Sequence, residues 1–88
     1  VIEVQQYWLE DLAPNPTSTS TNISYQIEGA SSAYLMVLNG FGTISNNYIL
    51  SPNTNQVNLD VNSFTPGVYN VILIVDGQAV DAKSLVTQ

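Results

Sequence analysis

The sequence predicts an all-β protein, an immunoglobulin-like antiparallel β-sandwich of about seven strands. Short apolar segments recur about every ten residues along the 88-residue chain. Each segment is bounded by Gly, Pro, Asn or Ser, which are turn-forming residues. No stretch shows the period of an amphipathic helix. A small closed barrel is the alternative fold.

The first strand is expected near the N-terminus. Residues 1–9 alternate imperfectly, and Ile2, Val4 and Trp8 can share one face of a strand. Trp8 is expected to pack in the core or at its edge, with a sugar-stacking platform as the alternative role.

A turn and a polar run follow. Pro14-Asn15-Pro16 cannot lie inside a central strand, because each proline lacks a backbone donor. Residues 17–21 are all Ser or Thr and are expected to form a linker. We therefore predict an N-terminal strand and linker segment over residues 1–12 and the β-sandwich over residues 13–88, in a single domain overall.

Four strands are expected in the middle of the chain, over residues 22–28, 34–38, 44–50 and 57–61. In the first of them Ile23, Tyr25 and Ile27 alternate with polar residues and should point inward. The segment Asn39-Gly40-Phe41-Gly42 predicts a tight reversal with positive φ angles. Phe64 is expected to close one end of the sandwich.

The most informative stretch is a hairpin near the C-terminus. Residues 68–75 are apolar except for Asn70, which predicts a central strand with both faces buried. Asp76-Gly77 predicts a two-residue type I′ turn. The return strand should place Val80, Ala82, Ser84 and Val86 on one face and Asp81, Lys83, Leu85 and Thr87 on the other.

Composition argues against several classes of function. The net charge is −6 and Lys83 is the single base, so nucleic acid and anionic membrane are not expected partners. The chain has no Cys and no His, which removes thiolate metal sites and the usual general base. We expect no enzyme activity and no cofactor. No long apolar run predicts a membrane-spanning helix, so direct membrane insertion is not expected.

Several short motifs occur in one order along the chain. These are Pro14-Asn15-Pro16, the segment from Leu35 to Gly42 with Asn39 inside it, Gly67-Val68-Tyr69, Asp76-Gly77 and Lys83-Ser84-Leu85-Val86. Together they resemble the C-terminal sorting domain of the type IX secretion system, type A, of secreted Bacteroidetes proteins. Ala13, Leu38 and Ser84 depart from the residues usual in that family.

The resemblance implies that the domain functions as a secretion and sorting signal. The domain would direct a passenger protein from the periplasm across the outer membrane, to be secreted or placed on the bacterial cell surface. Its expected partners are the outer-membrane secretion machinery and a sortase-like peptidase, which would cleave the domain upstream of or near Pro14 or anchor the passenger at the surface. The residues expected to be recognised are Pro14, Asn15, Pro16, Gly67, Tyr69, Asp76, Gly77, Lys83, Leu85 and Val86.

Turn and core chemistry explains each of these residues equally well, so both roles remain open. Two other functions are also considered. The chain could be an extracellular fibre or adhesin subunit that self-assembles through edge strands, with residues 1–9 as the donor strand. A carbohydrate-binding module would use Trp8, Tyr7, Tyr48 or Tyr34 as stacking platforms.

Overall fold

The computed structural model describes residues 7–10, 12, 19–51, 53–62 and 64–88. The described residues form seven strands and no helix. The strands are β1 (Trp8–Leu9), β2 (Ser20–Gln26), β3 (Ala33–Leu38), β4 (Ile44–Leu50), β5 (Gln56–Asp60), β6 (Gly67–Val75) and β7 (Gln78–Thr87). The predicted all-β fold is confirmed.

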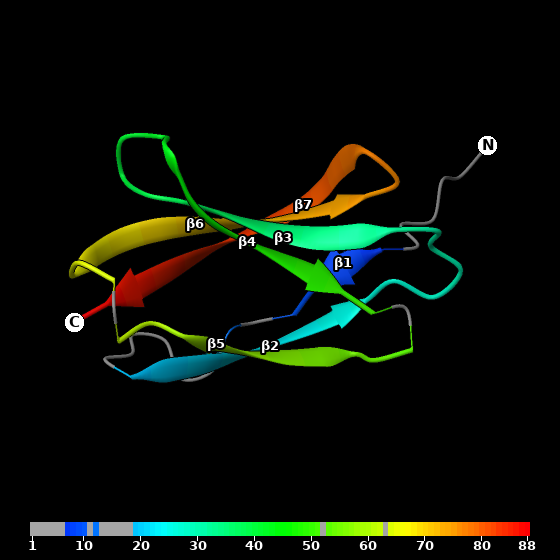
Figure 1. The fold of residues 1–88 in the computed structure, drawn as a ribbon, viewed down its shortest axis with the longest axis horizontal. Helices are drawn as coiled ribbons and strands as arrows, with labels where there is room; N and C mark the ends of the chain where they lie inside the picture. Colours follow the sequence, from blue (N-terminus) through cyan, green and yellow to red (C-terminus); the bar gives the residue numbers. More distant parts are fainter. Residues whose placement is uncertain (1–6, 11, 13–18, 52, 63) are drawn as a thin grey trace.

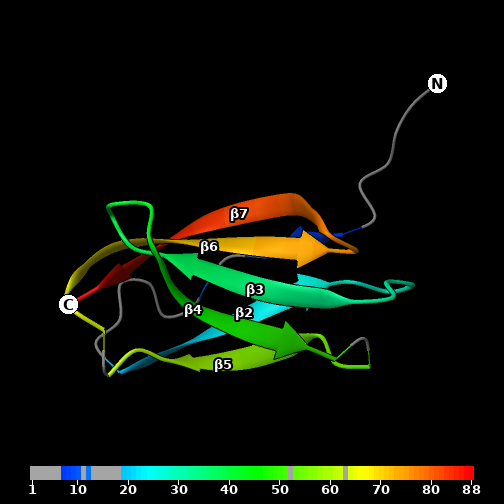
Figure 2. The same cartoon turned by 45° about the horizontal axis from the view of Figure 1, so that its top comes forward.

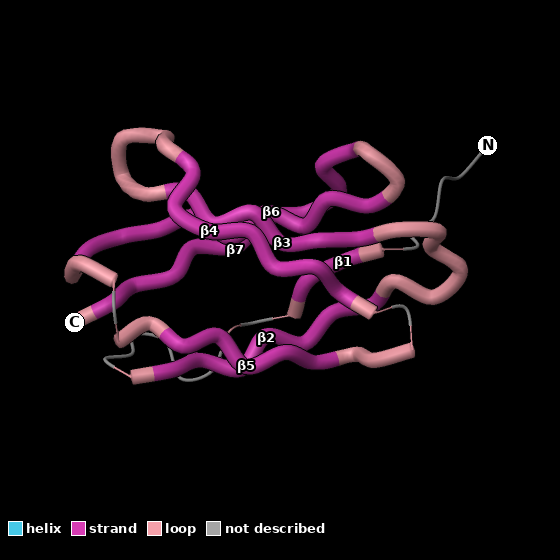
Figure 3. Tube along the Cα trace, in the orientation of Figure 1, coloured by secondary structure: helices cyan, strands magenta, loops and turns pink. Residues whose placement is uncertain are grey.

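Two antiparallel sheets pack face to face (Figures 1 and 3). One has the strand order β1-β2-β5 and the other the order β4-β3-β6-β7. The chain changes sheet between β2 and β3, between β4 and β5 and between β5 and β6 (Figure 2). Such crossovers between two separate antiparallel sheets define an immunoglobulin-like sandwich and not the alternative closed barrel.

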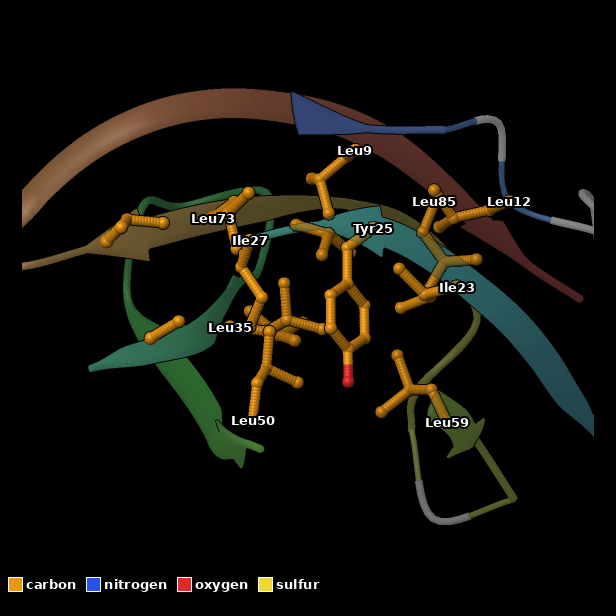
Figure 4. Packing of buried hydrophobic residues seen from close by; sticks show 14 of the residues in the cluster. Leu9, Leu12, Ile23, Tyr25, Ile27, Leu35, Leu50, Leu59, Leu73 and Leu85 are labelled. Atoms are coloured by element: carbon orange, nitrogen blue, oxygen red, sulfur yellow. The ribbon is translucent and has the colours of Figure 1, made fainter. Parts of the chain in front are cut away.

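The core lies between the two sheets (Figure 4). Ile23 and Leu59 come from one sheet, Leu35 and Leu73 come from the other, and all four are almost fully buried. Tyr25 points its ring between them. Burial of each such side chain stabilises the fold by about 2 kcal/mol, so this layer is the main stabilising element of a domain without disulfides.

The second strand begins earlier than the polar composition suggests. Ser20 and Thr21 were expected to belong to a linker, but β2 begins at Ser20. Thr21 lies opposite Leu59 and is completely buried. A β-branched threonine fits an inward strand position, although its hydroxyl finds no hydrogen-bond partner there.

The N-terminal strand is short where it is described. Ile2 and Val4 lie outside the described residues. Leu9, opposite Tyr25, supplies the buried side chain, whereas Trp8, opposite Gln26, is only partly buried on the outer side. Alternation along the strand therefore turns Trp8 away from the core, against the expectation that it packs there.

The C-terminal hairpin has the predicted turn. Asp76 and Gly77 both have positive φ, 51° and 85°, as a type I′ turn requires. The strand β6 is central, between β3 and β7. The prediction that both of its faces are buried holds from Leu73 to Val75 and is wrong for the first part of the strand. Val68 is 56% exposed and Asn70 is exposed, because no third layer of described residues covers the outer side of this sheet there.

The return strand alternates as predicted from Asp81 onward. Leu85 and Thr87 are buried on the inner side, while Ala82 and Ser84 are exposed on the outer side. A β-bulge changes the register near Ile74, which lies opposite Ala79, so that Val80 is an extra residue. Val80 therefore packs against the core, and its predicted place on the same face as Ala82, Ser84 and Val86 is wrong.

Candidate recognition surface

The predicted recognition residues of the hairpin lie at its two opposite ends, except for Lys83, which lies midway between them opposite Val71. Gly67 lies opposite Thr87, and Tyr69 lies opposite Leu85, at the end where β7 finishes. The turn at Asp76 lies at the far end, about 27 Å away by the rise of an antiparallel strand. The structure therefore does not bring all predicted residues together. Pro14, Asn15 and Pro16 lie outside the described residues.

Tyr69 and Thr87 hold the end of the sandwich closed. The hydroxyl of Tyr69 donates a 2.6 Å hydrogen bond to the carbonyl oxygen of Thr65, which also lies 3.1 Å from the hydroxyl of Thr87. The backbone N–H of Gly67 donates to the hydroxyl oxygen of Thr87 at 3.0 Å. A tyrosine that bonds back to the preceding turn is typical of immunoglobulin-like sandwiches. Phe64 closes this end as predicted, with its ring 5.0 Å from that of Tyr69.

The residues of the C-terminal tail motif face different surroundings. Leu85 is fully buried opposite Tyr69, so it belongs to the core. Val86 lies opposite Val68 on the outer side and is partly buried. Lys83 lies opposite the buried Val71, so it sits on the inner side of the sheet and is also partly buried. The side chain of Leu85 is thus inaccessible to a partner in the folded state.

The Asp76 carboxylate is engaged within the molecule. One carboxylate oxygen accepts hydrogen bonds of 3.0 Å from the backbone N–H groups of Ser31 and Ser32. The backbone N–H of Asp76 in turn donates to the carbonyl oxygen of Ser32 at 3.0 Å. These bonds tie the hairpin turn to the connection between β2 and β3.

The loop between β3 and β4 follows directly from its sequence. The side-chain oxygen of Asn39 accepts hydrogen bonds from the N–H groups of Phe41 and Thr43, at 2.9 and 3.1 Å. Gly42 adopts a φ of 79°, as the predicted reversal requires. The tip of this loop leaves the Phe41 side chain 96% exposed.

An open hollow of about 500 Å³ lies beside this loop. Its walls are the β3–β4 loop with Asn46 and the segment that enters β6, namely Asn39, Gly40, Phe41, Asn46, Phe64, Thr65, Pro66, Gly67, Val68 and Tyr69. Sequence reasoning did not assign Phe41 or Thr87 to this end. Phe41 gives no sequence signal, whereas the inward alternation of Leu85 and Thr87 could have indicated that Thr87 is buried.

A second hollow, of about 300 Å³, lies on the other sheet. Trp8, Glu10, Ser24, Gln26 and Gln56 are among its walls. Tyr7 and Tyr48, two of the proposed sugar platforms, pack instead against the core. Among the described residues, no cluster of acidic side chains could hold a metal ion and no helical segment qualifies as a membrane span.

The fold and the hollow at its end define an immunoglobulin-like β-sandwich module with an exposed, largely uncharged end. The chain belongs to the family described as the secretion system C-terminal sorting domain, whose model matches residues 11–88. It is therefore a C-terminal sorting signal for type IX secretion, as the resemblance implied. The family is one of sorting signals and not of enzymes.

A solved structure shows the same fold in a distant protein. The BSP domain of a biofilm associated protein has 13% sequence identity and a TM-score of 0.68, over 90% of this chain and 14% of that one. An immunoglobulin-like protein from Pseudomonas aeruginosa has 11% identity and a TM-score of 0.49, over 100% of this chain and 81% of that one. The chain thus spans a small part of the first protein. No curated protein matches the sequence significantly.

Family membership fixes the general role of the domain. It interacts with the type IX secretion machinery, and proteins that carry such a domain are exported and become secreted or cell-surface proteins.

Proposed function

We propose that the secretion machinery recognises the end of the sandwich that holds Gly67, Tyr69, Leu85 and Val86. We call it the sorting end, and it comprises residues 39–43, 64–69 and 85–87. One observation carries the proposal. Two separate sequence motifs converge there in space, beside an open hollow and a phenylalanine that is 96% exposed. A large exposed apolar side chain at such a place is typical of a protein interaction site.

The residues of the sorting end have two kinds of role in this proposal. Gly67, Tyr69 and Leu85 shape the surface from within. Gly67 donates a hydrogen bond to the Thr87 hydroxyl, Tyr69 donates one to the Thr65 carbonyl oxygen, and Leu85 packs in the core. Phe41 and Val86 contact the partner. Asp76 and Gly77 act at a distance, because they form the turn that keeps β7 in register with β6. Lys83 is assigned to the inner edge of the sheet and not to the contact surface.

A sortase-like peptidase is proposed to act on the N-terminal side of the domain. Leu9 and Leu12 are buried in the core, and Leu9 pairs with β2. A cut just before Pro14 would sever a strand that is packed into the sandwich. We therefore propose that the domain starts upstream of Tyr7, that the peptidase cuts there, and that Pro14-Asn15-Pro16 serves as the entrance to β2. Mass spectrometry of the released domain tests this, because a first residue after Leu12 would contradict it.

We also propose that the domain has no enzyme activity. Self-assembly through edge strands is the alternative function. In a fibre, residues 1–9 would complete a neighbouring sandwich. In the structure Leu9 already completes its own sandwich, which favours the sorting role.

The experiment uses a reporter protein with an export signal, fused upstream of the 88-residue chain in a host with type IX secretion. Phe41→Asp places a charge at the sorting end, and Asn53→Asp places the same charge at the far end. Both side chains are exposed, so neither change should unfold the domain. We expect Phe41→Asp to lower surface delivery about tenfold, and Asn53→Asp to leave it unchanged. Equal delivery of the two variants would contradict the proposal.

A further inference from the structure

The outer face of the four-stranded sheet is mainly apolar and has no charge, and its exposed polar side chains are those of Asn47, Asn70 and Ser84. It consists of the residues of β4, β3, β6 and β7 whose side chains alternate with the buried ones. The strands β3, β4 and β6 contain no charged residue at all. Asp81 and Lys83 are the charged residues of β7, and both lie on the inner side, opposite Leu73 and Val71. In a chain with a net charge of −6, this face is therefore neutral.

Registered rows of side chains make the face continuous. Ile49, Tyr34 and Ile74 lie side by side across β4, β3 and β6. Ile49 is 91% exposed, Tyr34 is partly buried and Ile74 is buried. Met36 and Ile72 form the next pair and are partly buried.

The next row contains the exposed polar residues Asn70 and Ser84, and the last row lies at the end where β7 finishes. Val68 and Val86 lie opposite each other there, and Val68 is 56% exposed. The face thus reaches the sorting end. All seven strands of the described residues belong to the two sheets (Figure 3), so none of the described strands covers this face.

The other sheet shows the contrast. Its outer side carries Ser24, Gln26, Asn58 and Asp60, so it is mainly polar, with the partly buried Trp8 as a large apolar side chain beside Gln26. An apolar outer face on only one of two sheets is unusual for an isolated soluble domain.

The area of the face indicates the kind of partner. Four strands with about six residues each cover about 19 Å by 20 Å, or about 400 Å². Contact through such a patch buries about 800 Å² in total, below the range of 1,200–2,000 Å² that stable complexes need and within the range of transient encounters. The face is thus too small for a permanent dimer. It suits a partner that must release the domain after delivery.

We propose that this face docks on an uncharged, apolar surface of the type IX secretion machinery, as an extension of the sorting end. This inference rests on the function proposed above. Docking on an apolar surface explains why the face carries no charge. A charged side chain there would become buried in the contact without an opposite charge or a hydrogen-bond partner, which is costly. The contact should also be insensitive to salt, because neither side contributes an ion pair.

Two asparagines provide a matched test. Asn47 is exposed on β4 and lies opposite Met36, on the apolar face. Asn22 is exposed on β2, on the opposite outer side, and its side-chain oxygen accepts a 2.8 Å hydrogen bond from Asn58. Asn47→Asp and Asn22→Asp both add one negative charge with almost no change of shape, and the second retains the hydrogen bond with Asn58.

The reporter fusion is used with Asn47→Asp, Ile49→Asp and Asn22→Asp, and thermal unfolding checks that each variant is folded. We expect Asn47→Asp and Ile49→Asp to lower surface delivery about tenfold relative to Asn22→Asp. A photo-crosslinking phenylalanine analogue at position 49 should capture a component of the machinery, and the same analogue at position 58 should not.

Three results would overturn the inference. The first is delivery of the Asn47→Asp and Ile49→Asp fusions at the level of Asn22→Asp. The second is a stable dimer of the purified chain that Ile49→Asp dissociates, since a second copy would then occupy the face. The third is crosslinking that high salt abolishes. Phe41→Asp could block delivery while the variants at positions 47 and 49 do not. That result would support recognition of the sorting end and contradict docking through the outer face of the four-stranded sheet.

Discussion

The carboxylate of Asp81 accepts a hydrogen bond of 2.8 Å from the backbone N–H of Leu9. These residues are 72 positions apart, in β7 and β1, and belong to different sheets. The bond attaches the first described strand to the strand that ends the hairpin. It makes the N-terminal strand part of the sandwich, although composition alone suggests a detachable segment.

Removal of this bond should loosen the sandwich. We expect Asp81→Ala to lower the free energy of unfolding by about 2 kcal/mol, because a partly buried N–H loses a charged acceptor. Glu28→Ala is the control, since it removes the same charge at an exposed site where the carboxylate bonds no described residue. Chemical denaturation measures both. Equal stability of the two variants would mean that the bond between the strands contributes nothing.

Thr21 predicts a gain in stability. Its hydroxyl is fully buried without a hydrogen-bond partner, so Thr21→Val should stabilise the domain by about 1 kcal/mol. The same change at Thr54 should destabilise it by about 1 kcal/mol, because the hydroxyl of Thr54 lies 2.6 Å from that of the buried Tyr25. Thermal unfolding of the pair is the measurement. A loss of stability in Thr21→Val would show that the hydroxyl has an unrecognised partner.

The type I′ turn predicts that replacement of Gly77 lowers the stability of the domain. Gly77 has a φ of 85°, so Gly77→Ala should cost about 1–2 kcal/mol through strain alone. Gly40 is the control, because its φ is not in the positive range and an added Cβ would lie 3.8 Å from the nearest atom, the carbonyl oxygen of Val68. Urea denaturation should therefore separate the two alanine variants. Equal unfolding midpoints would argue against the turn type.

The sequence predicted local structure best where a residue pattern is compatible with only one backbone conformation. Asp76-Gly77 predicted the turn because few dipeptides tolerate two positive φ angles. The alternation of Ile23, Tyr25 and Ile27 predicted a strand with one buried face, and all three are buried.

The sequence predicted least well which faces of a strand are buried by other parts of the chain. The apolar run from Val68 to Val75 indicates a strand, but an apolar run cannot show whether a third layer exists, and the part of the chain that the structure describes forms none. The burial of Thr21 was missed because a run of Ser and Thr resembles a linker in composition. The hydrogen bond between the Thr87 hydroxyl and the Thr65 carbonyl oxygen joins residues that are 22 positions apart, so no local sequence pattern indicates it.

The central claim, that this folded domain carries the sorting information, is tested most directly by truncation. The reporter fused to the 88-residue chain is compared with the same fusion lacking residues 78–88, which removes β7 and with it Leu85, Val86 and Thr87. Cell fractionation then measures the reporter in the periplasm and at the surface or in the medium. The account predicts that the complete fusion leaves the cell and that the truncated fusion accumulates in the periplasm. Delivery of the truncated fusion at the level of the complete one would contradict it.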